Sequence, residues 1–159
     1  MSAIALFLRL PITALEGLRS AAVPKKRIFG GVRDDMPNYL SRHARPIAEY
    51  RWSGYVIATV LAYLKDLGID LMRSGYQDLA NYLSKSRGVT AHVLSNDQRV
   101  QYSNALRGAF PEEELCAYYN QFNATSDTDA GRPMLDGIIV LRDALNAIDA
   151  ESVVLVTIG

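Results

Sequence analysis

The side chains that most often carry catalysis are scarce, with two histidines and one cysteine in the whole chain. A general base needs a nucleophile and an orienting partner within hydrogen-bond reach. His43 lies in a basic segment beside Arg42 and Arg45, and His92 lies among small and apolar residues where we expect a strand edge. Neither histidine has such a partner nearby in the sequence, so we interpret both as structural residues.

Cys116 follows three consecutive glutamates, residues 112–114. A nucleophilic thiolate needs cationic neighbours or a helix N-terminus to lower its pKa, whereas glutamates act in the opposite direction. We therefore expect Cys116 to be buried and inert, like most unpaired cysteines. A single cysteine also excludes an intrachain disulfide.

Two acidic residues, Asp127 and Asp129, begin a pattern that is similar to a calcium-binding loop. In such a loop the invariant glycine would fall on Arg132 and the bidentate glutamate on Ile138. Neither position can serve, so the sequence predicts a polar surface loop and no metal site.

A basic run, Lys25, Lys26 and Arg27, precedes the pair Gly30–Gly31. This run lacks the spacing of a phosphate-binding loop, and no strong helix follows it directly, so we interpret it as a solvated turn and predict no cofactor. Seventeen basic and seventeen acidic side chains cancel. Nucleic-acid binders usually carry a basic excess, so we expect no nucleic-acid partner. Zero net charge also removes repulsion between copies, which leaves a homo-oligomer open.

Length and composition indicate one globular domain over residues 1–159, with 49% apolar and 21% charged residues. The longest apolar stretch, residues 54–64, is about half of the ~20 residues needed to span a bilayer. The N-terminal apolar run lacks a basic region before it and a cleavage site after it. We therefore expect a soluble cytoplasmic protein with no membrane contact.

Strands are predicted at both ends of the chain. Residues 2–10 are rich in large apolar side chains and stop at Pro11, and residues 152–158 are almost uninterrupted valine, leucine and isoleucine. A continuous apolar strand is usually covered on both faces. The expected fold class is α+β: a single helix-rich domain with a small sheet built around the N- and C-terminal strands.

The helical period predicts a central helix over residues 50–67, apolar on most sides. Ser95 and Gln98 have the spacing of a capping box, and Pro111 with its glutamates opens another helix. We expect the remaining helices after Pro11 and over residues 76–83 and 133–148. Residues 23–46 form the longest irregular segment, with a short strand around residues 27–29.

Several of these segments resemble a known family. They are residues 1–18, the Trp52-x-Gly54 start of the central helix, residues 91–119, and a long helix running into a valine-rich strand that stops at Gly159. Together they resemble the YfbM-like family of small bacterial proteins, a domain of unknown function. The resemblance implies an α+β fold and bacterial origin but no activity. Family members often have Asp after the Trp and His a few positions on, where this chain has Ser53 and Val56.

The first functional hypothesis is a non-catalytic protein-binding module of a bacterial cytoplasm, such as an immunity protein that occludes a toxin. Nine tyrosines outnumber four phenylalanines, and tyrosine suits surfaces that become buried on binding. Aromatic anchors would form the centre, and acidic residues would steer a basic partner. The predicted contact residues are Trp52, Tyr55, Tyr118, Tyr119, Glu112, Glu113, Asp127 and Asp129.

The second hypothesis is a small enzyme or ligand-binding domain that uses a polar loop, residues 33–45. Clustered polar side chains in a long irregular segment are typical of a functional loop, although a solvated loop has the same composition. The convergent groups would be Arg33, Asp34, Asp35, His43 and Arg45.

Overall fold

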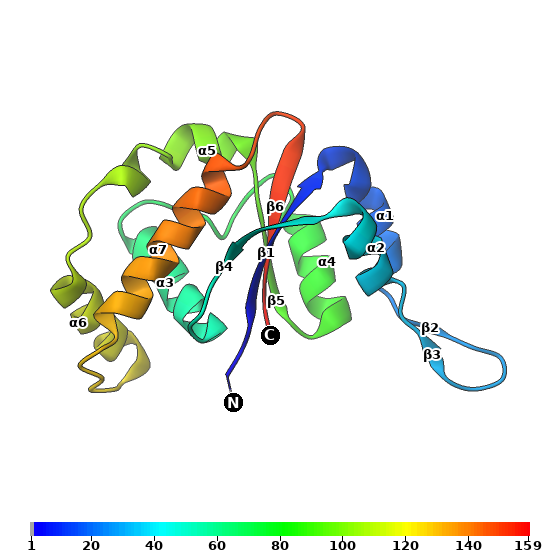
Figure 1. Cartoon of the computed structure of the whole chain (residues 1–159), viewed down its shortest axis with the longest axis horizontal. Coiled ribbons are helices and arrows are strands. Elements are labelled where there is room, and N and C mark those ends of the chain that lie inside the picture. The colour runs from blue at the N-terminus through cyan, green and yellow to red at the C-terminus, as the bar shows by residue number, and fades with distance from the viewer. Residues whose placement is uncertain (1) are drawn as a thin grey trace.

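The computed structural model describes residues 2–159, and a four-stranded antiparallel sheet lies at its centre (Figure 1). The strand order is β4-β1-β6-β5. β1 (Ala5–Pro11) and β6 (Ser152–Ile158) are the inner pair, while β4 (Arg45–Glu49) and β5 (Thr90–Leu94) are the edges. The terminal strands thus form the centre of the sheet, which confirms the predicted α+β fold class.

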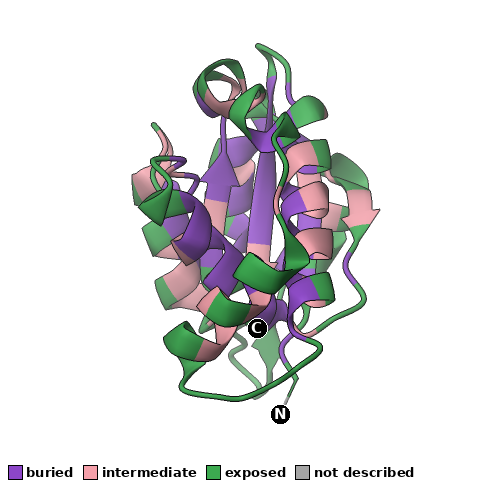
Figure 2. Cartoon of the chain, turned by 90° about the vertical axis from the view of Figure 1, so that its left-hand side faces the viewer, coloured by how far each residue is buried: buried purple, intermediate pink, exposed green. Residues whose placement is uncertain are grey.

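Both faces of the sheet are covered by helices, which explains the apolar run of β6. Alternate side chains of a strand point to opposite faces. Val154 and Val156 therefore enter one hydrophobic core, and Val153 and Leu155 enter the other. Figure 2 shows this central strand buried along nearly its whole length.

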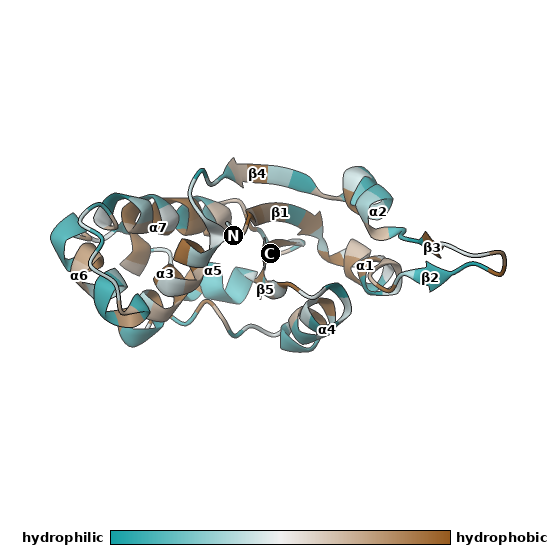
Figure 3. Ribbon diagram, turned by 90° about the horizontal axis from the view of Figure 1, so that it is seen from below, coloured by the Kyte–Doolittle hydropathy of each residue, from teal (hydrophilic) through white to brown (hydrophobic). Residues whose placement is uncertain are grey.

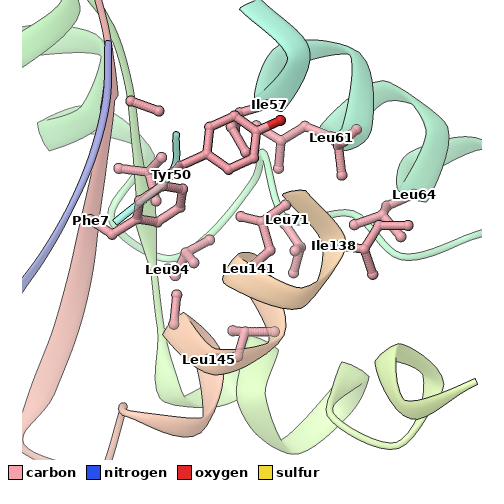
Figure 4. Close-up of a cluster of buried hydrophobic side chains, with 14 of the residues drawn as sticks. Phe7, Tyr50, Ile57, Leu61, Leu64, Leu71, Leu94, Ile138, Leu141 and Leu145 are labelled. Atoms are coloured by element: carbon pink, nitrogen blue, oxygen red, sulfur yellow. The ribbon is translucent and has the colours of Figure 1, made fainter. Parts of the chain in front are cut away.

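The larger core lies between the sheet and three helices, α3 (Gly54–Asp66), α6 (Glu112–Asn123) and α7 (Gly131–Asn146). Leucine and isoleucine side chains of α3 and α7 meet Phe7 of β1 in its centre (Figure 4). Burying each such side chain contributes about 1.5–3 kcal/mol. α3 is buried on most sides, as its sequence predicted.

The smaller core lies on the opposite face, under α1 (Leu15–Ala21), α2 (Met36–His43) and α4 (Gln77–Arg87). A short 3₁₀ turn, Ile12–Ala14, joins β1 to α1. α4 ends at Gly88, whose φ of 66° is the left-handed conformation that glycine adopts without strain.

The predicted capping box opens α5 (Asn96–Tyr102). The Gln98 side chain accepts from the Ser95 backbone N–H at 2.9 Å. In return, the backbone N–H of Gln98 points to Ser95 Oγ, but this contact does not have the geometry of a full hydrogen bond. A second 3₁₀ turn, Ala105–Arg107, follows before α6.

The segment predicted to be irregular, residues 23–46, is mostly ordered into elements. It holds a hairpin of β2 (Lys25–Lys26) and β3 (Val32–Arg33), then α2, then the start of β4. The strand expected around residues 27–29 is instead the tip of that hairpin. Pro37 is tolerated because it lies in the first turn of α2, where helix N–H groups have no partner in any case.

Among the described residues, no helix combines the length and the hydropathy that a membrane span requires.

Candidate functional site

The β2–β3 hairpin extends away from the body of the molecule, beyond α1 and α2 (Figures 1 and 3). Its strands have two residues each, and residues 27–31 form the tip. The Arg27 N–H donates to the Gly31 carbonyl at 3.1 Å. Gly30 and Gly31 have φ values of 88° and 87°, so the tight tip needs two residues without a Cβ.

The hairpin carries the two most exposed large apolar side chains among residues 2–159, and a third on its second strand. Ile28 is 96% exposed, Phe29 101% and Val32 65%. Apolar side chains at turn positions are unusual, because turns are normally polar. The sequence analysis missed these residues because it treated the segment as a basic turn. The signal that could have revealed them is an Ile-Phe pair placed between a basic run and a Gly-Gly pair.

Cations flank this apolar tip, and the base of the hairpin is held by ion pairs. Arg33 Nε donates to Asp35 at 2.6 Å, and Lys25 Nζ lies 3.9 Å from the same carboxylate. Lys26 and Arg27 have no ion pair among residues 2–159. The outer part of the hairpin is therefore both apolar and positively charged.

A bidentate ion pair ties the end of the hairpin to α4. Arg87 donates to both carboxylate oxygens of Asp34, at 2.7 and 3.0 Å. These hydrogen bonds from Arg87 are the main cause that holds the pKa of Asp34 below its ordinary value. The hairpin thus leaves the body from a fixed base.

The predicted polar loop, residues 33–45, does not exist as a loop, because α2 occupies most of it. Its five candidate residues fall in two places. Arg33, Asp34 and Asp35 form the ion pairs at the base of the hairpin. His43 is the last residue of α2 and Arg45 the first of β4, and both line a pocket beside β1. The expected convergence of all five side chains on one site is therefore wrong.

The four predicted acidic contact residues do come together. Glu112 and Glu113 of α6, with Asp127 and Asp129 of the following loop, line an open pocket of about 800 Å³. Asn120 shapes the loop: its side chain donates to the Asp127 carbonyl and accepts from the Asp127 N–H, each at 2.8 Å. The loop is polar and on the surface, as its sequence predicted.

Cys116 also lines this pocket and is only half-buried, which corrects the expectation of a fully buried thiol. The loop of residues 124–130 passes over it, and the thiol donates to the Asp127 carbonyl at 3.2 Å. The described residues hold no cluster of three or more His, Cys, Asp or Glu side chains arranged to bind a metal ion.

Trp52 is connected to the acidic pocket through a chain of polar contacts. Its indole N–H donates to Asp136 at 3.0 Å, Arg132 Nε lies 2.9 Å from the other oxygen of that carboxylate, and Arg132 also approaches Glu112 at 3.7 Å. Trp52 precedes α3 instead of lying in it, and is 45% exposed. Tyr55, in the first turn of α3, is 59% exposed.

Tyr118 and Tyr119 are half-buried against the larger core and offer little free surface. The Tyr118 ring packs on Tyr63 with centroids 5.0 Å apart, and its hydroxyl donates to Asp66 at 2.7 Å. Burial, with the added effect of the Asp66 carboxylate, raises the pKa of Tyr118 to about 12. Of the predicted aromatic anchors, only Trp52 and Tyr55 are presented to solvent.

Comparison with solved structures found a match of low identity. The chain is similar to the crystal structure of YfbM from Escherichia coli, a protein of unknown function, with 11% identity and a TM-score of 0.44 over 97% of this chain and 99% of that one. This match brings no activity with it. No protein-family model and no curated protein matches the chain.

Proposed function

We propose that the protein is a non-catalytic protein-binding module of a bacterial cytoplasm, and that the tip of the β2–β3 hairpin is its main contact. The observation that carries this proposal is the full exposure of Ile28 and Phe29 at the end of a projecting element. Exposed apolar clusters with polar surroundings mark interaction sites on folded proteins. Burial of each side chain in a partner's pocket contributes about 1.5–3 kcal/mol.

The partner's contact surface is an apolar pocket with an acidic rim. Lys26 and Arg27 flank the apolar tip and have no ion pair of their own among the described residues, so they are free to meet carboxylates on the partner. Complementary charge of this kind speeds encounter and selects the partner, while the buried aromatic and aliphatic groups supply most of the affinity.

The acidic pocket and Trp52 form a second contact surface in the same proposal. Glu112, Glu113, Asp127 and Asp129 suit basic side chains of a partner. Trp52 lies nearby, where its indole N–H donates to Asp136 of α7. Occlusion of a toxin, as an immunity protein does, is the narrow form of this function. In that case the toxin would contact the hairpin, the acidic surface or both.

The experiment is capture of partners from the native host by tagged protein, followed by mass spectrometry and a mass measurement of the purified complex. The test variant is Ile28→Asp with Phe29→Asp. The matched control is Val100→Asp, which places a charge on another strongly exposed apolar residue, 74% exposed on α5. Both variants should keep the wild-type unfolding midpoint, because neither site contributes to a core.

The proposal expects one stoichiometric partner that the control retains and the hairpin variant loses by a factor of at least about 100, the effect of losing two buried apolar anchors. Equal capture by both variants would contradict a role for the hairpin. If Trp52→Ala abolishes binding and the hairpin variant does not, the main contact lies on the acidic surface and not on the hairpin. Binding of the hairpin to anionic lipid vesicles instead of a protein would overturn the assignment of partner class.

A further inference from the structure

A pocket lined by several arginines lies where β1 ends and β4 begins. None of the hairpin residues 25–33 lines it. Its volume is about 420 Å³. Three arginines and one histidine line it, along with two acidic residues: Arg9, Arg42, His43, Arg45, Asp149 and Glu151. The arrangement of these charges points to a ligand that the chain itself does not supply.

Two of the arginines are placed directly opposite each other. Arg9 of β1 pairs with Arg45 of β4 in the register of the sheet, so their side chains leave the same face. Like charges at directly opposite positions of neighbouring strands destabilise a sheet. Arg45 has no ion pair among residues 2–159, and neither has Arg42. An anion between these guanidinium groups would turn a repulsive pair into a binding site.

Only one nitrogen of the Arg9 guanidinium group has an acceptor among the described residues. Its Nη2 donates to Asp149 at 2.7 Å, but its Nε is buried and has no acceptor among the described residues. That Nε is covered by protein atoms, but the Arg9 side chain as a whole is 35% exposed, so a ligand in the pocket can accept from the rest of the guanidinium group.

The acidic residues of the pocket do not neutralise it. Asp149 is held in its own turn, where it accepts from Ser152 Oγ at 2.7 Å and from the Glu151 N–H at 3.0 Å. These hydrogen bonds, the one from Ser152 first, keep the pKa of Asp149 below its ordinary value, so it stays ionised and tied to Arg9. Glu151 is then the single remaining carboxylate that lines the pocket against Arg42 and Arg45.

We propose that this pocket binds a small molecule through a phosphate group, whose oxygens accept from the guanidinium groups of Arg9, Arg42 and Arg45. Guanidinium groups match phosphate geometry with paired hydrogen bonds, which favours phosphate over a single carboxylate where several arginines meet. The pocket volume exceeds that of a phosphate ion and leaves room for an organic part, within the usual size of ligand pockets.

The test is a titration of ¹⁵N-labelled protein with inorganic phosphate at constant ionic strength, following the arginine Nε–H resonances. The Arg9 Nε–H signal should shift and saturate, whereas the signal of Arg27, on the hairpin, should not move. Arg45→Thr should weaken phosphate binding by at least about tenfold, the effect of losing one charge-assisted hydrogen-bond pair. Arg27→Thr is the matched control and should bind like the wild type.

Thermal unfolding distinguishes this role from a structural one. Phosphate should raise the unfolding temperature of the wild type and not that of Arg45→Thr, because only a bound ligand stabilises the folded state. Without phosphate, Arg45→Thr should be at least as stable as the wild type, since it removes the repulsion with Arg9.

Three results would overturn the proposal: no saturable shift at Arg9, an equal response to chloride, or lower stability of Arg45→Thr without ligand. A response to phosphatidylglycerol vesicles without any response to free phosphate would assign the site to lipid headgroups and would also contradict it.

Discussion

At the scale of single residues, two polar side chains fix how the layers of the molecule meet. Tyr50 is buried in the larger core, and its hydroxyl donates to the Pro133 carbonyl of α7 at 2.7 Å. Burial raises the pKa of this hydroxyl, so it stays protonated and keeps donating. On the other face of the sheet, Arg87 of α4 donates hydrogen bonds to Asp34 and to the Ala22 carbonyl, and so holds α4 to the segment between α1 and α2.

Tyr50→Phe should destabilise the fold by about 1 kcal/mol, because it removes a buried hydrogen bond without changing the packed ring. Tyr55→Phe is the matched control, since Tyr55 is 59% exposed, and should change stability by less than about 0.5 kcal/mol. Urea unfolding of the three proteins measures both values. Equal stability of wild type and Tyr50→Phe would show that the hydrogen bond contributes nothing.

The ion pair of Asp34 and Arg87 predicts a dependence of stability on pH. The pKa of Asp34 is lowered in the folded state, mainly by its hydrogen bonds from Arg87. The unfolded state therefore binds the proton more tightly, and the stabilisation is present above the ordinary pKa of 3.8 and lost as the pH falls below it. Partial exposure keeps the effect below about 1 kcal/mol.

The measurement is the urea midpoint of Asp34→Asn and of the wild type across this pH range. The variant should be less stable at pH 6, and the difference should shrink as the pH falls below 3.8. The same change combined with Arg87→Gln should cost less than the sum of the two single changes, because both remove the same ion pair. A difference that grows toward low pH would contradict the assignment.

At the scale of elements, the close contact of α3 and α7 sets the thickness of the larger core. Gly137 makes this approach possible: a Cβ built on it would lie 2.9 Å from Val60 and 3.2 Å from Ile57. Both neighbours are fully buried side chains of α3 with no free space to move into.

Gly137→Ala should therefore destabilise the protein, by about 1–3 kcal/mol of overpacking less the ~1 kcal/mol that alanine contributes in a helix. Gly75→Ala is the control, because nothing lies within 4 Å of the added methyl group there. Thermal unfolding compares the two variants. A more stable Gly137→Ala would show that helix propensity dominates at this contact.

The elements also show which parts of the fold the sequence can predict. β6 and α3 were predictable because both are buried on most sides, and their sequences are therefore apolar at nearly every position. α2 and β4 were not, because Pro37 and Pro46 interrupt their patterns. The structure tolerates Pro37 in the first turn of a helix and Pro46 in an edge strand, where a missing N–H has no ladder partner to lose.

The candidate sites were less predictable than the fold, for a related reason. The four acidic residues could be named from two neighbouring segments of the chain, but the pocket that they line was not predicted. The phosphate pocket joins Arg9 to Arg45, which are brought together only by the pairing of β1 with β4. No local pattern encodes that contact.

At the scale of the whole molecule, the hairpin and the body place their apolar side chains in opposite ways. The body buries its apolar side chains in two cores on either side of one sheet, whereas the hairpin exposes Ile28 and Phe29 completely. The acidic pocket lies over α6 and α7, at the opposite end of the molecule from the hairpin (Figure 1). The net charge of the molecule is zero, but its two ends thus present surfaces of opposite sign.

The most direct test of the central claim, that the hairpin tip docks into a partner protein, is site-specific photo-crosslinking in the native host. A photoreactive phenylalanine analogue replaces Phe29 in one variant and Val100 in a control. We predict that the Phe29 position crosslinks to one protein species and that the Val100 position does not. Crosslinks from Phe29 only to lipid, only to another copy of this chain, or to the same products as the Val100 control would contradict it.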